Sequence, residues 1–135
     1  MFQKISLIGR LGQEPSMRYM PNGDPVTSFS VATDRVYTKN DQKVKDTIWF
    51  RVSVFGRQAE NCNQYLDKGK LVYVEGRLNA DAETGGPRLY TAQDGTTRAS
   101  FDIVAGDVRF LSPKGEGGSN GSAEPAADSD SDIPF

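Results

Sequence analysis

Aromatic and basic side chains alternate with apolar ones in one short segment of the chain. Within residues 47–55, Trp49, Arg51 and Phe55 lie an even number of positions apart. Because successive side chains of a β-strand point to opposite faces, a strand here has one apolar face and a second face on which two rings flank a guanidinium. Rings stack on bases and a guanidinium attracts phosphate, so this pattern is typical of a surface for single-stranded nucleic acid. The alternative is that both faces are buried, one in the core and one under a second subunit.

More basic and aromatic residues lie near this segment. The residues before it are Arg35, Tyr37, Lys39, Lys43 and Lys45, and Arg57 follows it. They are consistent with a flexible basic wall beside a binding groove, although a solvated, charged hairpin loop explains them equally well. A glycine-containing hairpin predicted around residues 79–98 carries or adjoins Arg77, Arg88, Tyr90 and Arg98, and its Asp81 and Glu83 dilute the positive charge.

The residue types required for most enzyme chemistry are missing. The chain has no histidine, and its single cysteine, Cys62, lies on the apolar side of a predicted helix, where we expect an inert thiol. Asp102 and Asp107 flank a predicted strand bend without a partner motif, so solvated charges explain them better than a carboxylate hydrolase does. We therefore expect no enzyme, no metal site and no cofactor. The absence of a long apolar run or a signal peptide predicts a soluble, intracellular protein without a membrane partner.

The net charge of −2 combines two segments of opposite sign. Residues 1–112 contain 15 Lys and Arg against 13 Asp and Glu, whereas residues 113–135 contain one Lys against five acids. The second segment is rich in Gly, Ser, Pro and Ala and cannot bury enough apolar surface to fold, so we predict that it is disordered. We divide the chain into a domain at 1–112, a linker at 113–127 and an acidic tip at 128–135.

The acidic tip ends in two large apolar residues that have no core to join. Its sequence combines Asp128, Asp130 and Asp132 with Ile133, Pro134 and Phe135. Most acidic tails only solubilise a protein. An aromatic anchor with a free carboxylate and steering acids is also the form of a docking peptide, which makes this tip a candidate partner-binding segment.

The pattern of residues 1–112 predicts mainly strands. The predicted strands cover residues 4–11, 26–33, 47–55, 71–78 and 99–110, the last bent near Gly106. The predicted helix covers 57–68, with Gly69 as its C-cap and with Lys68 and Lys70 serving its C-terminus. One short helix between strands 3 and 4 fits an all-β fold, a five-stranded OB-fold (Greek-key barrel). Periodicity alone leaves a small sandwich open.

Five sequence segments in this order resemble the bacterial single-stranded DNA-binding proteins, and the resemblance covers nearly the whole chain. They are residues 7–15, 18–23, 49–56 with Ala59 and Glu60, 65–78 and 132–135. Each segment is modestly specific, and their order and spacing together are highly specific.

The resemblance implies a homotetramer that wraps single-stranded DNA without sequence preference. The implied DNA-binding residues are Arg10, Arg35, Tyr37, Lys43, Lys45, Trp49, Arg51, Phe55, Arg57, Arg77, Arg88 and Tyr90. Tyr37 and Tyr90 stand where relatives often carry tryptophan, and Phe50 stands where some place a histidine near the subunit interface. Residues 79–87 look like an insertion.

The resemblance also implies partners and a location for the protein. The tip is expected to recruit replication, recombination and repair proteins, among them a polymerase clamp-loader subunit, helicases, primase and an exonuclease. The implied location is the bacterial cytoplasm, at the nucleoid and replication forks. The alternative function is a protein-interaction scaffold that acts mainly through its tail.

Overall fold

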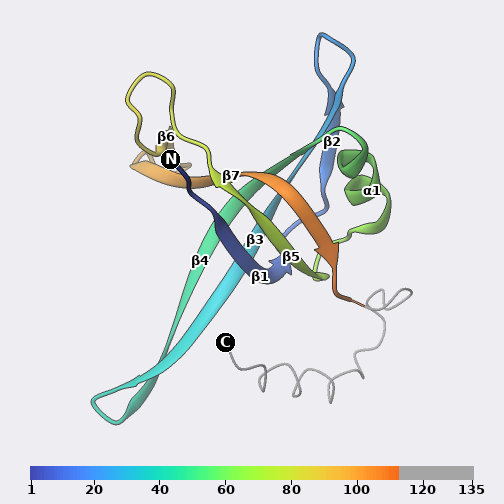
Figure 1. The fold of residues 1–135 in the computed structure, drawn as a ribbon. Coiled ribbons are helices and arrows are strands. Elements are labelled where there is room, and N and C mark those ends of the chain that lie inside the picture. Colours follow the sequence, from blue (N-terminus) through green and yellow to red (C-terminus); the bar gives the residue numbers. More distant parts are fainter. Residues whose placement is uncertain (113–135) are drawn as a thin grey trace.

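The computed structural model describes residues 1–112, and the predicted linker and acidic tip lie outside the described residues (Figure 1). Within residues 1–112 the elements are β1 (Ile5–Leu11), β2 (Ser16–Tyr19), β3 (Pro25–Lys39), β4 (Gln42–Phe55), α1 (Arg57–Tyr65), β5 (Leu71–Leu78), β6 (Arg88–Thr91) and β7 (Thr97–Phe110). The five predicted strands correspond to β1, β3, β4, β5 and β7. The short strands β2 and β6 were not predicted, because four residues are too few for an alternating pattern to be recognised.

Five strands close into a barrel. The strand order β1-β5-β7-β4-β3 returns to β1, because β1 also pairs with β3 at Arg10 and Leu11. Gly9 makes this closure possible, since a Cβ atom at that position would lie 2.2 Å from the carbonyl oxygen of Ala32 on β3. All barrel pairs are antiparallel except β4 with β7. Helix α1 lies between the third and fourth barrel strands, so the predicted OB-fold is confirmed and the sandwich is excluded.

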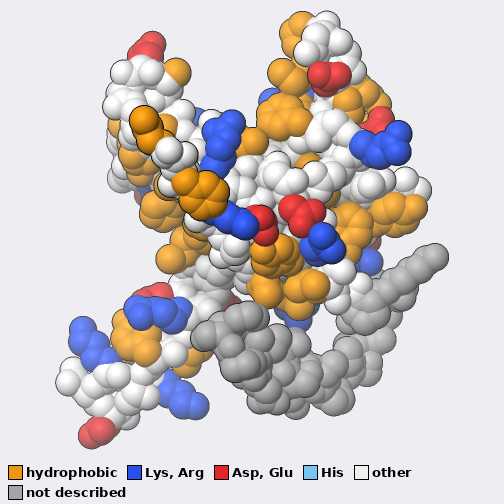
Figure 2. Space-filling view, in the orientation of Figure 1, with side chains coloured by type: hydrophobic (Ala, Val, Ile, Leu, Met, Phe, Trp, Pro, Cys, Tyr) orange, Lys and Arg blue, Asp and Glu red, His pale blue; other side chains and the backbone are white. Residues whose placement is uncertain are grey.

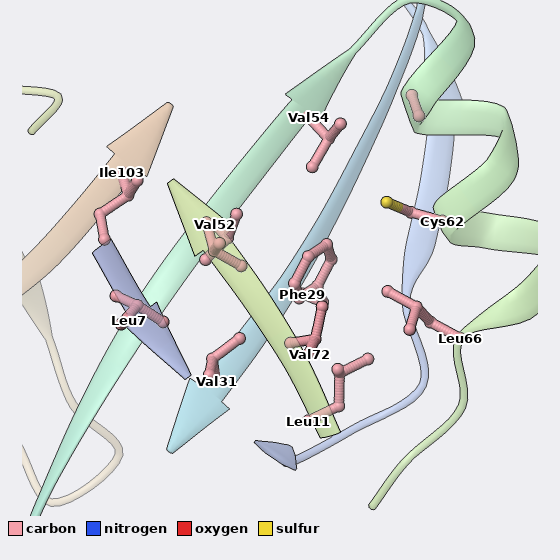
Figure 3. Packing of buried hydrophobic residues seen from close by; sticks show 12 residues of the cluster. Leu7, Leu11, Phe29, Val31, Val52, Val54, Cys62, Leu66, Val72 and Ile103 are labelled. Carbon is pink, nitrogen blue, oxygen red and sulfur yellow. The ribbon is translucent and has the colours of Figure 1, made fainter. Parts of the chain in front are cut away.

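The core fills the barrel interior and continues under α1. Apolar side chains from every barrel strand meet there, as Figure 3 shows for Leu7, Phe29, Val31, Val52, Val72 and Ile103. The helix adds Ala59 and Cys62, and Leu66 follows at its end. Burial raises the pKa of the Cys62 thiol to about 12, in keeping with the inert role predicted for it.

The side chain of Gln58 fastens α1 to a bulge in β7. Its amide nitrogen donates to the Gly106 carbonyl at 3.1 Å, and its amide oxygen accepts from the Val108 N–H at 3.0 Å. Here Glu75 and Gly76 of β5 pair with Asp107 and Ala105, which leaves Gly106 unpaired. The predicted bend near Gly106 is therefore a β-bulge.

The predicted end of the helix was wrong. Helix α1 ends at Tyr65, and Leu66 adopts an extended conformation because its side chain turns into the core, where it is 2% exposed. Gly69 has a positive φ of 89° and belongs to the turn before β5. Lys68 and Lys70 therefore do not cap the helix, whose last turn contains no basic residue.

Strands β3 and β4 extend beyond the barrel as a two-stranded arm, seen at the lower left of Figure 1. Their ladder continues from Asp34 paired with Thr47 to Lys39 paired with Gln42. Asn40 and Asp41, with φ of 53° and 64°, form the turn. The sequence left a flexible basic wall and a charged hairpin loop equally open for this connection, and the structure shows a regular hairpin. Backbone pairing across a tight turn needs no apolar side chains.

Candidate nucleic-acid interface

A groove of about 650 Å³ lies between strand β4 and the β6–β7 hairpin. Its lining includes four of the predicted residues, Trp49 and Arg51 from β4 and Arg88 and Tyr90 from β6. Trp49 is 53% exposed and Tyr90 is 42% exposed, so both rings are open to solvent in the single chain. The alternation of β4 explains this placement, since Val52 and Val54 on its other face are fully buried.

The position of the Trp49 ring depends on a glycine that the sequence analysis did not single out. A Cβ atom at Gly12 would lie 2.4 Å from Cζ3 and 2.7 Å from Cη2 of the indole. The ring therefore lies against the backbone just after β1. On its own strand pair, Trp49 is opposite the small residue Ala32. The indole thus has one side supported by protein while about half of its surface is exposed to solvent.

The arginines of the groove differ in their partners. Arg88 Nε donates to Asp102 Oδ2 at 2.7 Å, and Arg98 Nη2 lies 3.0 Å from Asp94 Oδ2. Arg51 makes no hydrogen bond or ion pair with any of residues 1–112, although its charge acts on Asp102. The groove therefore combines two neutralised guanidinium groups with one that is available to an incoming phosphate.

The environment of Asp102 differs from the one that the sequence predicted. Its side chain is only 13% exposed, and it accepts hydrogen bonds from Arg88 and from the Ser100 hydroxyl, so it is not a solvated charge. Burial by itself raises the pKa of Asp102, but the hydrogen bonds from Arg88 and Ser100 and the charges of Arg88 and Arg51 lower it overall. Asp107, on the other side of the bend, pairs with Arg109 at 3.0 Å.

A second group of predicted residues lies on the β3–β4 arm, where Figure 2 shows several basic side chains. Arg35 stacks on Tyr37 with its Cζ 4.5 Å from the ring centroid, and its Nη2 lies 3.3 Å from Asp46 Oδ2. Lys45 pairs with Asp34 at 3.6 Å. Lys43 is exposed opposite Thr38 and makes no ion pair within the described part of the chain. The arm therefore presents a stacked ring and cations, some of them partly neutralised.

The remaining four predicted residues do not line the groove. Phe55 is 42% exposed at the far end of β4, opposite Val26, and Arg57 begins α1. Arg77 is exposed on β5. Arg10 lies on β1 and donates to the Gly69 carbonyl at 3.0 Å. The structure thus separates the predicted set into a groove, an arm and four outlying positions.

Phe101 is a groove residue that the sequence analysis missed. It pairs in register with Phe50, their ring centroids are 6.0 Å apart, and it is 51% exposed. On β7 it lies two positions before the buried Ile103 and therefore on the same face of the strand, so its sequence pattern predicts a core position. Phe101 precedes the part of β7 that pairs with β5, which begins at Ile103, and no local sequence pattern reveals where that pairing begins.

Residues 1–112 contain neither a metal-binding cluster nor a membrane-spanning helix. No group of three or more Cys, Asp or Glu side chains in this part of the chain is placed to hold a metal ion. None of its helices is long and apolar enough to cross a membrane.

Known proteins are similar to this chain in both sequence and fold. The model of the single-strand binding protein family matches residues 2–111. Single-stranded DNA-binding proteins of Neisseria meningitidis serogroup A and Thermotoga maritima are each 43% identical over 114 residues, or 84% of this chain. The match covers 62% of the Neisseria protein and 76% of the Thermotoga protein.

Solved structures agree with these matches. A small single-stranded DNA-binding protein from Streptomyces coelicolor superposes with a TM-score of 0.65 at 26% identity, covering 81% of this chain and 94% of that one. An SSB from Plasmodium falciparum, solved in complex with single-stranded DNA, superposes with a TM-score of 0.64 at 28% identity, covering 82% and 96%.

The closed barrel and its open groove place the chain in the class of OB-fold proteins. Within that class, the chain belongs to the single-strand binding protein family. This membership confirms the resemblance found in the sequence and the prediction of a non-enzymatic protein.

Proposed function

We propose that the chain binds single-stranded DNA without sequence preference. The observation that carries this proposal is the groove in which the exposed rings of Trp49 and Tyr90 lie beside Arg51. Stacking requires only the face of a base, which every base has, and a cation binds any phosphate. The similarity to a structure solved with single-stranded DNA supports the same proposal.

Trp49 fluorescence tests this proposal directly, because Trp49 is the only tryptophan of the chain. Saturating oligo(dT) at low salt is expected to quench its emission strongly, whereas duplex DNA of equal phosphate content is expected to quench it weakly. Replacing Trp49 by phenylalanine keeps a stacking ring, so this variant retains most of the binding when a labelled oligonucleotide is followed instead. An unchanged emission spectrum at saturating oligo(dT) would contradict the proposal.

We also propose that the chain assembles with itself, as a homotetramer. Residues 5–9 of β1 pair with β5 on one side, whereas β1 pairs with β3 only at Arg10 and Leu11. The other edge of residues 5–9 therefore has backbone groups available to a second chain. Light scattering is expected to give four times the 14.8 kDa of one chain. A mass of one chain at micromolar concentration would contradict this assembly.

The predicted acidic tip supports a role in replication, recombination and repair at the nucleoid and replication forks of the bacterial cytoplasm. We propose that Ile133, Pro134 and Phe135 recruit the clamp-loader subunit, helicases, primase and exonuclease that act on single strands. Deleting residues 128–135 is expected to abolish the binding of these proteins while DNA affinity stays the same or rises. A truncated chain that still binds all of them would contradict this assignment.

A further inference from the structure

The Arg88–Asp102 ion pair is built into the wall of the groove. Arg88 uses Nε and Nη2 toward Asp102, at 2.7 Å and 3.4 Å, and Nη2 also lies 3.1 Å from the Ser100 hydroxyl. Ser100 in turn donates to Asp102. Arg88 and Ser100 line the groove, whereas Asp102 is not among the lining residues and its side chain is only 13% exposed. The hydrogen bonds to Asp102 and Ser100 therefore fix the orientation of the guanidinium, and Asp102 itself is largely buried.

The ion pair with Asp102 also determines which kind of ligand group Arg88 can contact. Its Cζ lies 5.7 Å from the centroid of the Tyr90 ring, so the guanidinium and the ring form adjacent surfaces. A phosphate that approached Nε or Nη2 would have to compete with a carboxylate that is largely shielded from water. Bases can stack on such surfaces without this competition.

The difference between a paired and an unpaired arginine can be measured through the counterions that DNA releases on binding. A cation that is already paired with a protein carboxylate neutralises no phosphate, so the DNA releases no counterion on its account. An unpaired cation neutralises one phosphate, and the DNA then releases about one counterion. In the groove, Arg51 is the arginine without an ion pair among residues 1–112. The slope of log affinity against log salt concentration therefore reports which arginines contact phosphate.

We propose that Asp102 is a positioning residue that determines what the groove recognises: it holds Arg88 beside Tyr90 as a neutral surface for bases and leaves Arg51 to bind phosphate. This inference rests on the proposed binding of single-stranded DNA. It assigns to an acidic residue a role in binding a polyanion, and it limits how strongly binding depends on salt.

The test is Asp102→Asn, with oligo(dT) affinity followed by Trp49 fluorescence over a range of salt concentrations. Freeing Arg88 for phosphate is expected to raise affinity at low salt and to steepen the salt slope by about 0.7. The loss of affinity between about 50 and 200 mM salt then grows by roughly 2–3-fold. An unchanged or shallower slope overturns the proposal, because a merely structural defect lowers affinity equally at every salt concentration.

Two variants serve as controls. Asp102→Glu keeps the carboxylate and is expected to keep the wild-type slope. Asp107→Asn removes another carboxylate of β7 that pairs with an arginine, Arg109, but it lies outside the groove lining. This variant is expected to bind like the wild type. A steeper slope in Asp107→Asn would show that the effect is a general consequence of lost negative charge and would also overturn the proposal.

A second pair of variants decides the question if Asp102→Asn does not fold. Arg51→Gln is expected to reduce the slope by about 0.7, whereas Arg88→Gln weakens binding with the slope unchanged. An equal reduction in both variants overturns the role of Asp102. Wild-type protein that fails to bind oligo(dT) overturns the proposed function itself, so the two failures are distinguishable.

Discussion

At the scale of single residues, Gly12 controls the position of Trp49. A methyl group there would overlap the indole, so Gly12→Ala is expected to displace the ring. We expect a shifted Trp49 emission maximum and weaker oligo(dT) binding. The loss of binding free energy should not exceed the ~1–3 kcal/mol that stacking one base on an aromatic side chain contributes, a range already known for single-strand-binding proteins. Gly86→Ala is the control, since its Cβ would meet only Thr84 Oγ1 at 3.6 Å. Unchanged emission in Gly12→Ala would refute the positioning role.

Cys62 provides a pH-dependent prediction at the same scale. Its pKa is about 12 in the folded chain against 9.0 as the reference, so the unfolded chain loses this proton first as pH rises. Burial of the neutral thiol thus contributes stability that is fully present below pH 9.0 and is lost as pH rises toward about 12. We expect urea denaturation to show a steeper fall in stability above pH 9.0 for the wild type than for Cys62→Ala. Parallel pH profiles would contradict this expectation.

At the scale of elements, the side chain of Gln58 joins the helix to the barrel through two hydrogen bonds. Gln58→Ala leaves the Val108 N–H and the Gly106 carbonyl without their partner, and part of this site is open to water. We therefore expect a destabilisation of about 1 kcal/mol, measured as a lower urea midpoint. Gln64→Ala, on the exposed side of the same helix, is expected to leave the midpoint unchanged. Equal urea midpoints for the two variants would show that the hydrogen bonds of Gln58 contribute nothing to stability.

The same elements show what the sequence could predict. Val52 and Val54 are buried and alternate with the more exposed Ser53 and Phe55, so the strand and its two faces followed from residues 47–55. Ile48, on the apolar face, is nevertheless 44% exposed. The charged hairpin was one of two alternatives left open, and the length of its strands was not predicted, because most of the paired residues are polar and leave no hydrophobic pattern. The helix end was misplaced because Leu66 is held by core packing, a tertiary effect that local capping rules do not include.

The site was only partly predictable for a related reason. Trp49 and Arg51 share one strand face, so their proximity is local information. Arg88 and Tyr90 join them through the pairing of β6 with β7 and of β7 with β4, which the sequence does not specify. Phe55 shares the face of Trp49 but lies beyond the groove, because the groove covers only one end of the strand.

At the scale of the whole molecule, charge is divided between the domain and the segment after it. A chain ending at Ser112 has an excess of two basic residues, whereas the full chain has an excess of two acidic ones. We expect the shortened chain to bind oligo(dT) more tightly at low salt, with the difference vanishing at high salt as charges are screened. Replacing Asp128, Asp130 and Asp132 by asparagine in the full chain should reproduce part of the gain. Equal affinities at low salt would show that the acidic segment does not oppose DNA binding.

Closure of the barrel through β1 has a consequence for the synthesis of the chain. Leu7 pairs with Val74, and Ile5 pairs with Gly76, so β1 leaves the ribosome long before the strand that it needs. At about 5–20 residues per second, the intervening segment takes on the order of 3 to 13 s to make. During that time Leu7 and Leu11 have no β5 to pack against, and the barrel cannot close. Pairing so distant in sequence also makes folding slow once all strands are present. The nascent chain therefore carries an apolar strand that has to be kept from other unfinished chains until β5 emerges.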